Sequence, residues 1–180
     1  MPKYICDSQK YQLAGPKEDS IGLTVQIANL PKEIEVEGYK LSLKTTFHAS
    51  LVCIGKIIEK YKVSRPDFIN EIVSDFCSFT KNKSIDFIRF RNEFRFVVQN
   101  ERRSVIVMCD ISNLEEFYGV INKKYCLKIE PQPTHITLYT LQPDPGIFLI
   151  DNGDIDNLSK VIVPPLILEQ ALENQTSQNK

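Results

Sequence analysis

The chain has 180 residues, of which 42% are apolar and 25% charged, and its formal net charge is −1. This length suits one domain or two small packed lobes, and the composition excludes disordered, collagen-like and coiled-coil chains. No apolar stretch approaches the roughly 18 residues of a membrane span, and no signal-like apolar segment follows the start. We therefore expect no membrane association and a reducing compartment, the cytoplasm or the nucleus. The balanced charge excludes a chain whose whole surface binds nucleic acid, but it is compatible with a small anion or an RNA end.

The cysteines show no pairing pattern. Their number is odd and no two are spaced as C-x-x-C; they are Cys6, Cys53, Cys77, Cys109 and Cys126. Most lie in apolar segments, where cysteine behaves as a small hydrophobic residue. The sequence therefore predicts free thiols rather than disulfides or a metal site.

The first half of the chain contains predicted strands and one predicted helix. Residues 1–19 are polar, show no clear period, and are expected to form an irregular arm. Apolar and β-branched runs predict strands at 21–29, 39–45 and 47–54. Ser64 and Asp67 form a capping-box pattern before apolar residues at helical spacing, which predicts a helix over 65–80.

The second half adds a predicted meander, another helix and further strands. Short polar breaks separate β-rich runs, which predicts an antiparallel meander of strands at 84–91, 94–99 and 104–110. A second capping box predicts a helix over 113–125. Further strands are expected at 134–141, 146–150 and 161–168, with a turn at 151–154 and a polar tail at 169–180. This order favours an α+β fold with mostly antiparallel sheet and flanking helices over residues 20–168.

The two histidines of the chain lie in the same local pattern. His48 and His135 are each followed by a small or apolar residue, a hydroxyl residue and leucine. Successive side chains of a strand point to opposite faces, so His48 shares a face with Ser50, and His135 with Thr137. The intervening residues and the leucines would point into a core. We expect the two strands to be neighbours, with both pairs facing one cleft.

The chemistry of such a face suits phosphoryl transfer. A hydroxyl two residues from an imidazole lies about 6–7 Å along the strand, so both can contact one phosphate-sized group. One neutral imidazole would take a proton from the attacking oxygen while a protonated one gives a proton to the leaving oxygen. Ser50 and Thr137 would donate hydrogen bonds to the non-bridging oxygens. The alternatives are two partly buried histidines with hydroxyl neighbours, or a metal site. No carboxylate or cysteine lies at ligand spacing on either strand, so we predict no metal and no cofactor.

The motifs HASL (48–51) and HITL (135–138) resemble those of the two-histidine (2H) phosphoesterases. The LigT-like members of this superfamily include RNA 2′,3′-cyclic phosphodiesterases and 2′-5′ RNA ligases. The resemblance spans about residues 20–168, although its specific content is eight positions. It implies two pseudo-symmetric lobes around a central cleft, His48 and His135 as acid and base, and Ser50 and Thr137 as phosphate-binding residues.

The function expected from this resemblance is that of a hydrolase. It is a metal-independent phosphodiesterase, active as a monomer on a nucleotide or RNA terminus, most simply by opening a 2′,3′-cyclic phosphate. The alternatives are a 2′-5′ phosphodiesterase or RNA-end exonuclease of the same superfamily, and a non-catalytic module that binds nucleotides or RNA ends. Four matching side chains do not choose among these substrates.

Four further residues are candidate substrate contacts. Tyr139 follows Thr137 by two positions, so on a regular strand it would share the polar face and bond a phosphate or stack on a base. Phe47 could also stack. Arg89 and Arg91 belong to the segment 81–103, where basic side chains outnumber acidic ones, and would lie on a phosphate track beside the cleft. The alternatives are a cleft-edge aromatic for Tyr139 and a solvated sheet face for the arginines.

Overall fold

The computed structural model describes residues 3–15, 17–141 and 146–178. These residues form an α+β fold with one ten-stranded antiparallel sheet and five helices. The strands are β1 Lys3–Ile5, β2 Tyr11–Ala14, β3 Ser20–Val25, β4 Glu33–Val36, β5 Tyr39–Leu43, β6 Phe47–Cys53, β7 Phe87–Gln99, β8 Arg102–Ile111, β9 His135–Thr140 and β10 Ser159–Ile162. The helices are α1 Ile54–Tyr61, α2 Phe68–Asn82, α3 Leu114–Tyr125, α4 Asn152–Leu158 and α5 Leu166–Gln178. Among the described residues, no helix is both long and apolar enough to cross a bilayer.

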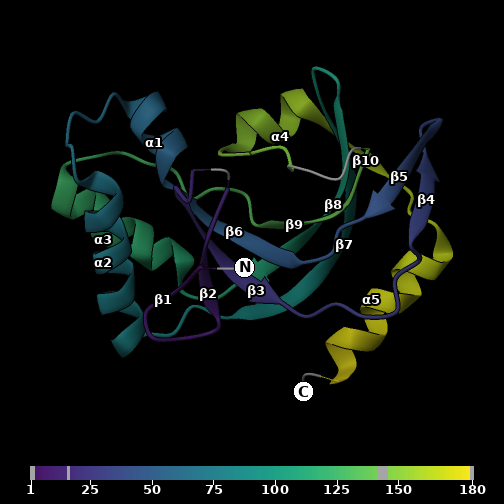
Figure 1. The fold of residues 1–180 in the computed structure, drawn as a ribbon, viewed down its shortest axis with the longest axis horizontal. Coiled ribbons are helices and arrows are strands. Elements are labelled where there is room, and N and C mark those ends of the chain that lie inside the picture. The colour runs from purple at the N-terminus through teal and green to yellow at the C-terminus, as the bar shows by residue number, and fades with distance from the viewer. Residues whose placement is uncertain (1–2, 16, 142–145, 179–180) are drawn as a thin grey trace.

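The sheet brings the two histidine strands to its middle. Its strand order is β1-β2-β3-β6-β9-β8-β7-β10, and the β4–β5 hairpin joins it through a pairing of β5 with β9. Neighbouring strands run antiparallel throughout this order. Figure 1 shows β6 and β9 crossing the centre of the molecule, with the hairpin at one side. The position of β6 and β9 therefore places both motifs in the centre of the sheet.

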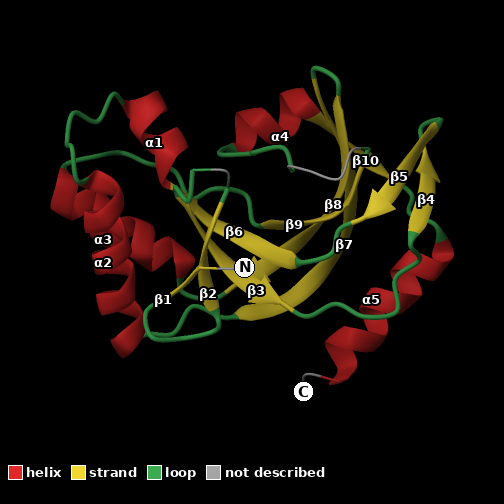
Figure 2. Cartoon of the chain, in the orientation of Figure 1, coloured by secondary structure: helices red, strands yellow, loops and turns green. Residues whose placement is uncertain are grey.

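One face of the sheet packs against three helices. Figure 2 shows α1, α2 and α3 grouped on the left of the molecule. Their apolar faces contribute to the main core, which includes Ile54, Phe76 and Phe117 together with apolar residues of the strands. The residues of β6 and β9 that alternate with the histidine motif belong to this core and are fully buried: Ala49, Leu51, Ile136 and Leu138. The expectation that they point into a core is confirmed, and it leaves the histidines on the opposite face.

A smaller core lies on that opposite face. It joins Ile106 and Met108 of β8 to Ile147 and Leu149 of the segment before α4, and to Ile155 of α4. Ile106 is paired across the sheet with Thr137, and Met108 with His135. Directly opposed residues share a face of the sheet, so this smaller core lies beside the histidine motif of β9.

The meander predicted for residues 84–110 is wrong in its strand count. The predicted strands at 84–91 and 94–99 are a single strand, β7, which pairs with β8 as a long hairpin. The register shifts between Phe90 and Phe94, where the sequence has its polar Asn92-Glu93. A bulge admits extra residues without ending the strand, so this polar break is an irregularity inside β7.

The two ends of the chain are more regular than the sequence predicts. The segment 1–19, expected to be irregular, contributes β1 and β2 to the sheet. The predicted strand at 161–168 is replaced by β10 and by the start of α5, which extends through the predicted polar tail. Pro165 lies directly before α5, and its carbonyl accepts from the N–H of Leu168 at 2.8 Å. Its missing N–H costs the helix no hydrogen bond, because the first N–H groups of a helix have no partner within it. Residues 1–2, 16 and 179–180 of these segments lie outside the described part of the chain.

Other short regions also differ from the prediction, among them β4 at Glu33–Val36, where no strand is predicted. No strand forms at 146–150, although Ile147 and Leu149 are buried. The predicted turn at 151–154 is the first turn of α4, where the Asp151 carboxylate accepts a hydrogen bond from the backbone of Asp154 at 2.9 Å. This contact is a helix cap. The helix α1, for which the sequence has no capping box, begins directly after β6.

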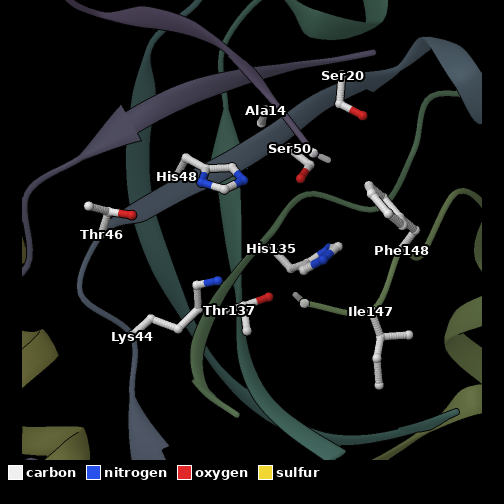
Figure 3. A pocket seen from close by; sticks show the side chains of 12 residues that line it. Ala14, Ser20, Lys44, Thr46, His48, Ser50, His135, Thr137, Ile147 and Phe148 are labelled. Atoms are coloured by element: carbon white, nitrogen blue, oxygen red, sulfur yellow. The ribbon is translucent and has the colours of Figure 1, made fainter. Parts of the chain in front are cut away.

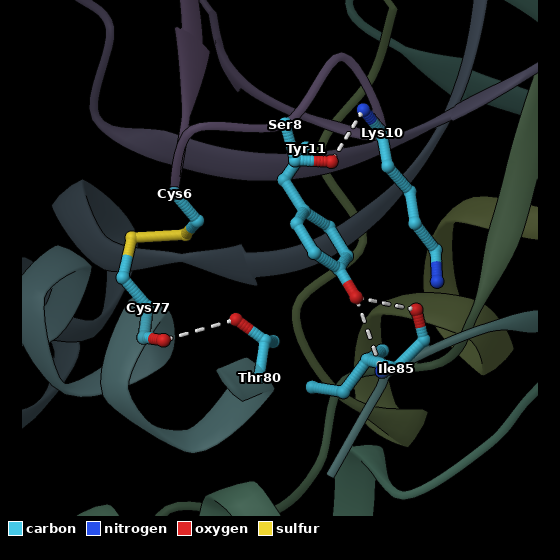
Figure 4. Close-up of a disulfide and its surroundings, with 7 residues drawn as sticks. All are labelled: Cys6, Ser8, Lys10, Tyr11, Cys77, Thr80 and Ile85. Carbon is cyan, nitrogen blue, oxygen red and sulfur yellow. Dashed lines mark hydrogen bonds between the residues drawn. A yellow bond between two sulfur atoms is a disulfide. The ribbon is translucent and has the colours of Figure 1, made fainter. Parts of the chain in front are cut away.

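The prediction that all five cysteines are free is wrong for two of them. Cys6 and Cys77 form a disulfide between positions 71 residues apart, whereas Cys53, Cys109 and Cys126 are free. Figure 4 shows the bond joining the end of β1 to α2. Close by, the Tyr11 hydroxyl donates to the carbonyl of Ile85 at 2.9 Å and accepts from its N–H at 3.1 Å. Pairing of β1 and β2 with the sheet brings Cys6 against α2, a contact between distant segments that cysteine spacing does not reveal.

Candidate active site

The two histidine strands are neighbours, and their polar faces line one cavity. β6 and β9 are antiparallel, with Ala49 opposite Ile136. His48 and Ser50 flank Ala49, and the histidine and hydroxyl of the second motif flank Ile136. All four motif side chains line a cavity of about 460 Å³, shown in Figure 3. The geometry expected from the repeated pattern is therefore confirmed: His48, Ser50, His135 and Thr137 meet at one site.

The cavity also has walls that the sequence analysis missed. Its other lining residues come from β2, β3, the segment before β6 and the segment before α4: Ala14, Gly15, Ser20, Lys44, Thr46, Gly146, Ile147 and Phe148. Lys44 and Thr46 continue the alternation of His48 and Ser50 backwards along the chain, and extending that pattern would have found them. The segment 146–148 has no comparable local signal, because it reaches the cavity by packing on β8.

His135 is held in one tautomer. Its side chain is buried, and its Nδ1 lies 2.8 Å from the carbonyl oxygen of Pro133. A carbonyl oxygen only accepts hydrogen bonds, so Nδ1 carries the proton and the neutral ring keeps a lone pair on Nε2. Burial lowers the pKa of His135, and the hydrogen bond to Pro133 acts in the opposite direction. His135 is thus a neutral imidazole with a proton acceptor at Nε2.

His48 is also neutral at pH 7. Burial lowers its pKa to about 4, and the positive charges of Lys44 and of protonated His135 act in the same direction. Neither imidazole of the ligand-free protein therefore holds an extra proton near neutrality. A bound anion would favour the imidazolium form, so a proton would be taken up when an anion enters the cavity.

Gly22 provides room for the His48 ring. A β-carbon at Gly22, which lies on the adjacent strand β3, would be 3.0 Å from Cδ2 of His48. Gly22 is paired with Ser50 across the two strands, and Thr24 is paired with His48. The absence of a side chain at this one position of β3 lets the imidazole lie against the sheet.

Replacement of Gly22 by alanine is expected to displace the ring and destabilise the fold. Glycine to alanine within a strand normally adds about 0.5–1 kcal/mol of stability, whereas overpacking costs about 1–3 kcal/mol. We expect the second effect to dominate in Gly22→Ala, with altered NMR signals and an altered pKa of His48. The matched control is Gly119→Ala on the exposed face of α3, where an added β-carbon meets no described atom within 4 Å. Urea unfolding of both variants measures whether each change lowers or raises the free energy of unfolding. An unchanged His48 signal in Gly22→Ala would contradict the expected displacement of the ring.

A buried glutamine connects the two motif strands. The side-chain oxygen of Gln132 accepts from the N–H of Cys53 at 2.9 Å, and its amide nitrogen donates to the carbonyl of Ser50 at 2.7 Å. Gln132 lies three residues before His135 and is 4% exposed. It thus forms hydrogen bonds with two backbone groups of β6 that lie beyond the pairing of Ala49 with Ile136. These bonds fix Ser50 and the residues after it relative to the strand that carries His135.

Tyr139 and Phe47 do not line the cavity. The Tyr139 side chain is fully buried in the main core, and its hydroxyl donates to the carbonyl of Pro31 at 2.9 Å. The β8–β9 register shifts at this point, because one step along β8 corresponds to two along β9 between Thr137 and Tyr139. This irregularity breaks the alternation from which the prediction was made. Phe47 packs against the main core, since it alternates with His48.

Arg89 and Arg91 do not line the cavity either. Both side chains bind the carboxylate of Asp110 on β8, at 2.7 Å and 2.6 Å respectively. Arg89 lies directly opposite Asp110 in the hairpin. These charges are exposed on the β7–β8 hairpin, as in the alternative interpretation of a solvated sheet face. The prediction that the two arginines contact substrate at the cleft is not supported by their position.

The lining of the cavity suits an anion more than a cation. Its described residues include two imidazoles, the hydroxyls of Ser20, Thr46, Ser50 and Thr137, and the ammonium group of Lys44, but no carboxylate. Within residues 3–15, 17–141 and 146–178, no group of three or more His, Cys, Asp or Glu side chains could hold a metal ion. The remaining wall is apolar, with Ala14, Ile147 and Phe148. The cavity thus combines proton carriers and hydrogen-bond donors with an apolar surface.

Comparisons of this chain with protein-family models, with curated proteins and with solved structures found no match. Inference of its function therefore depends on the residues of the cavity and their arrangement.

Proposed function

We propose that this protein is a metal-independent phosphodiesterase of the two-histidine kind, acting on a nucleotide or RNA terminus. The reaction proposed first is the hydrolysis of a 2′,3′-cyclic phosphate. The observation that carries the proposal is the meeting of two His-x-Ser/Thr pairs, from adjacent central strands, in one cavity. A binding module needs no second imidazole, whereas acid–base catalysis needs a proton acceptor and a proton donor.

In the proposed reaction one imidazole acts as the base and the other as the acid. His135, with its Nδ1 proton directed to Pro133, offers Nε2 as the base that takes a proton from water. The water oxygen forms a bond to phosphorus as the bond to one ribose oxygen breaks. His48, protonated when the anionic substrate binds, gives its proton to that leaving oxygen. The product is a phosphate monoester. His135 then releases its extra proton to solvent and His48 takes one up, which restores the starting protonation of the pair.

The hydroxyls have a separate role in this proposal. Ser50 and Thr137 lie two residues from the histidines on the cavity face, where they would donate hydrogen bonds to the non-bridging phosphate oxygens. Negative charge accumulates on these oxygens during the reaction, so donors fixed by strands stabilise the transition state. Gly146 lies against Thr137, since a β-carbon at Gly146 would be 3.1 Å from the Thr137 hydroxyl oxygen. The segment before α4 would therefore limit the space around the bound phosphate.

The size and shape of the cavity support a small substrate or a chain end. Its volume of about 460 Å³ lies within the range of roughly 300–1,000 Å³ typical of small-molecule sites. The polar wall would hold the phosphate and ribose, and the apolar wall with Phe148 would contact a base. The two-lobed arrangement belongs to the same proposal, with β6 and β9 as the central strands of the lobes.

A substrate panel in the presence of EDTA tests the function. The purified chain is incubated with 2′,3′-cyclic mononucleotides, 2′-5′ dinucleotides and RNA with a 3′ tail, and products are identified by mass spectrometry. We expect the cyclic phosphates to be opened at an undiminished rate in chelator. Cleavage of only the dinucleotides or the RNA would indicate another reaction of the same class. Binding without cleavage of any substrate would favour the binding module, and loss of activity in EDTA with recovery in zinc would indicate a metal enzyme.

A further inference from the structure

Lys44 is positioned at the cavity although it belongs to neither motif. It lies between β5 and β6, it is half-buried, and it lines the cavity together with both histidines and both motif hydroxyls. Figure 3 shows its side chain extended towards the space between His48 and Thr137. Among the described lining residues, Lys44 is the one with a permanent charge.

The backbone of Lys44 is fixed to the second motif strand. Its N–H donates to the carbonyl of Leu138 at 2.9 Å, next to Thr137. The preceding residues continue this attachment, because Leu43 is paired with Tyr139 and Ser42 with Thr140. Lys44 is therefore connected to β9 by hydrogen bonds and to β6 by the chain itself. The backbone from which the Lys44 side chain extends is thus fixed beside both motif strands.

The charge of Lys44 reaches the reacting groups. Lys44 and His48 line the same cavity, and the positive charge of Lys44 is one of the causes that lower the pKa of His48. A phosphate located between His48 and Thr137 would be near the same ammonium group, which would attract its negative charge. Hydrogen bonds between an ammonium group and a phosphate oxygen are charge-assisted and stronger than those of hydroxyls.

We propose that Lys44 is a third phosphate-binding residue of this cavity, which acts with Ser50 and Thr137 and selects phosphorylated over neutral ligands. The inference rests on the proposed function, which places a phosphate between the two motifs. It extends that function by assigning ligand discrimination to a residue outside them. Lys44 attracts the anion and holds a non-bridging oxygen while the imidazoles exchange protons.

The test compares a charged and a neutral ligand. Affinities for 2′,3′-cyclic AMP and adenosine are measured by calorimetry at pH 7, in the full chain carrying His135→Asn to suppress turnover. We expect Lys44→Gln to weaken binding of the cyclic phosphate by about tenfold or more, with adenosine unaffected, and Lys44→Arg to retain most of the affinity. The matched control is Lys128→Gln, which removes an exposed lysine outside the cavity and should leave both affinities unchanged.

A second readout separates a local charge effect from a structural one. In Lys44→Gln, and not in Lys44→Arg, the pKa of His48 followed by NMR in an otherwise unaltered chain should rise, because a repelling positive charge is removed. The inference is overturned if Lys44→Gln binds the cyclic phosphate as tightly as the parent chain, or if it loses adenosine binding equally. If the binding pattern holds but no cleavage is found, Lys44 keeps its role and the proposed hydrolysis fails. If no variant binds cyclic AMP, both fail.

Discussion

Replacement of His48 or His135 by alanine is expected to lower the turnover of a 2′,3′-cyclic nucleotide by about 10²–10⁴. One imidazole accepts the proton of the attacking water and the other gives a proton to the leaving oxygen. Because both transfers are needed, neither imidazole can replace the other. Ser50→Ala and Thr137→Ala should cause smaller losses, since each removes one of several donors to the phosphate. Steady-state rates on the cyclic substrate, measured in EDTA, check the order of these effects.

The control for His135 must separate chemistry from folding. Alanine at this buried position removes the hydrogen bond to Pro133 and leaves an empty space, so it also destabilises the protein. In His135→Asn the side-chain amide nitrogen occupies the place of Nδ1 and can still donate to Pro133, whereas nothing replaces Nε2. We expect His135→Asn to be more stable than His135→Ala and equally inactive. Parental turnover in His135→Asn, or in His48→Ala, would show that the chemistry lies elsewhere.

The elements with the strongest local patterns are predicted correctly. The strand over 47–54 and the helices over 65–80 and 113–125 correspond to β6, α2 and α3 within a few residues. Apolar spacing and β-branched runs depend on neighbouring residues only. The two predicted capping boxes are wrong, because α2 begins after Asp67 and α3 after Asn113, each without a side-chain cap, and the Ser112 hydroxyl accepts from the N–H of Asp86 instead. The site also follows from neighbouring residues, because a residue and its second neighbour share a face of any regular strand. The meeting of His48, Ser50, His135 and Thr137 followed once both strands entered one sheet side by side.

Features that depend on distant partners were not predicted. Arg89 and Arg91 look like free basic residues until Asp110 is placed opposite them in the hairpin. The pairing of Cys6 with Cys77 likewise depends on the packing of β1 against α2. Tyr139 shows a third limit, since the alternation rule fails at an irregularity whose presence is set by pairing with β8. Local patterns therefore located the candidate catalytic residues but not their surroundings.

The pH dependence of kcat/KM is expected to be bell-shaped, with its maximum on the acid side of pH 6.5. Burial lowers the pKa of both imidazoles, that of His48 to about 4. The form with one proton on the pair is most populated between the two macroscopic pKa values, both of which lie below 6.5 in the free protein. Above the higher value both rings are neutral, so kcat/KM should fall about tenfold per pH unit.

Protein stability has to be measured over the same range. Because the folded-state pKa of His48 is lowered, the unfolded chain binds more protons between pH 6.5 and about 4. Stability therefore falls as the pH falls through this window, by on the order of 3 kcal/mol from His48 alone. Urea unfolding at each pH identifies the points at which the acid limb reflects loss of the folded state rather than titration of the site.

The profile of kcat should be displaced to higher pH than that of kcat/KM. The profile of kcat/KM reports the free protein, whereas kcat reports the complex, in which the negative charge of the phosphate favours the imidazolium form. Removal of a repelling charge in Lys44→Gln should move the limb of kcat/KM that His48 sets to higher pH as well. Rates measured from pH 4 to 9 at constant ionic strength check both shifts. A rate that rises continuously towards high pH would leave a base but no general acid, and it would remove His48 from the proposed mechanism.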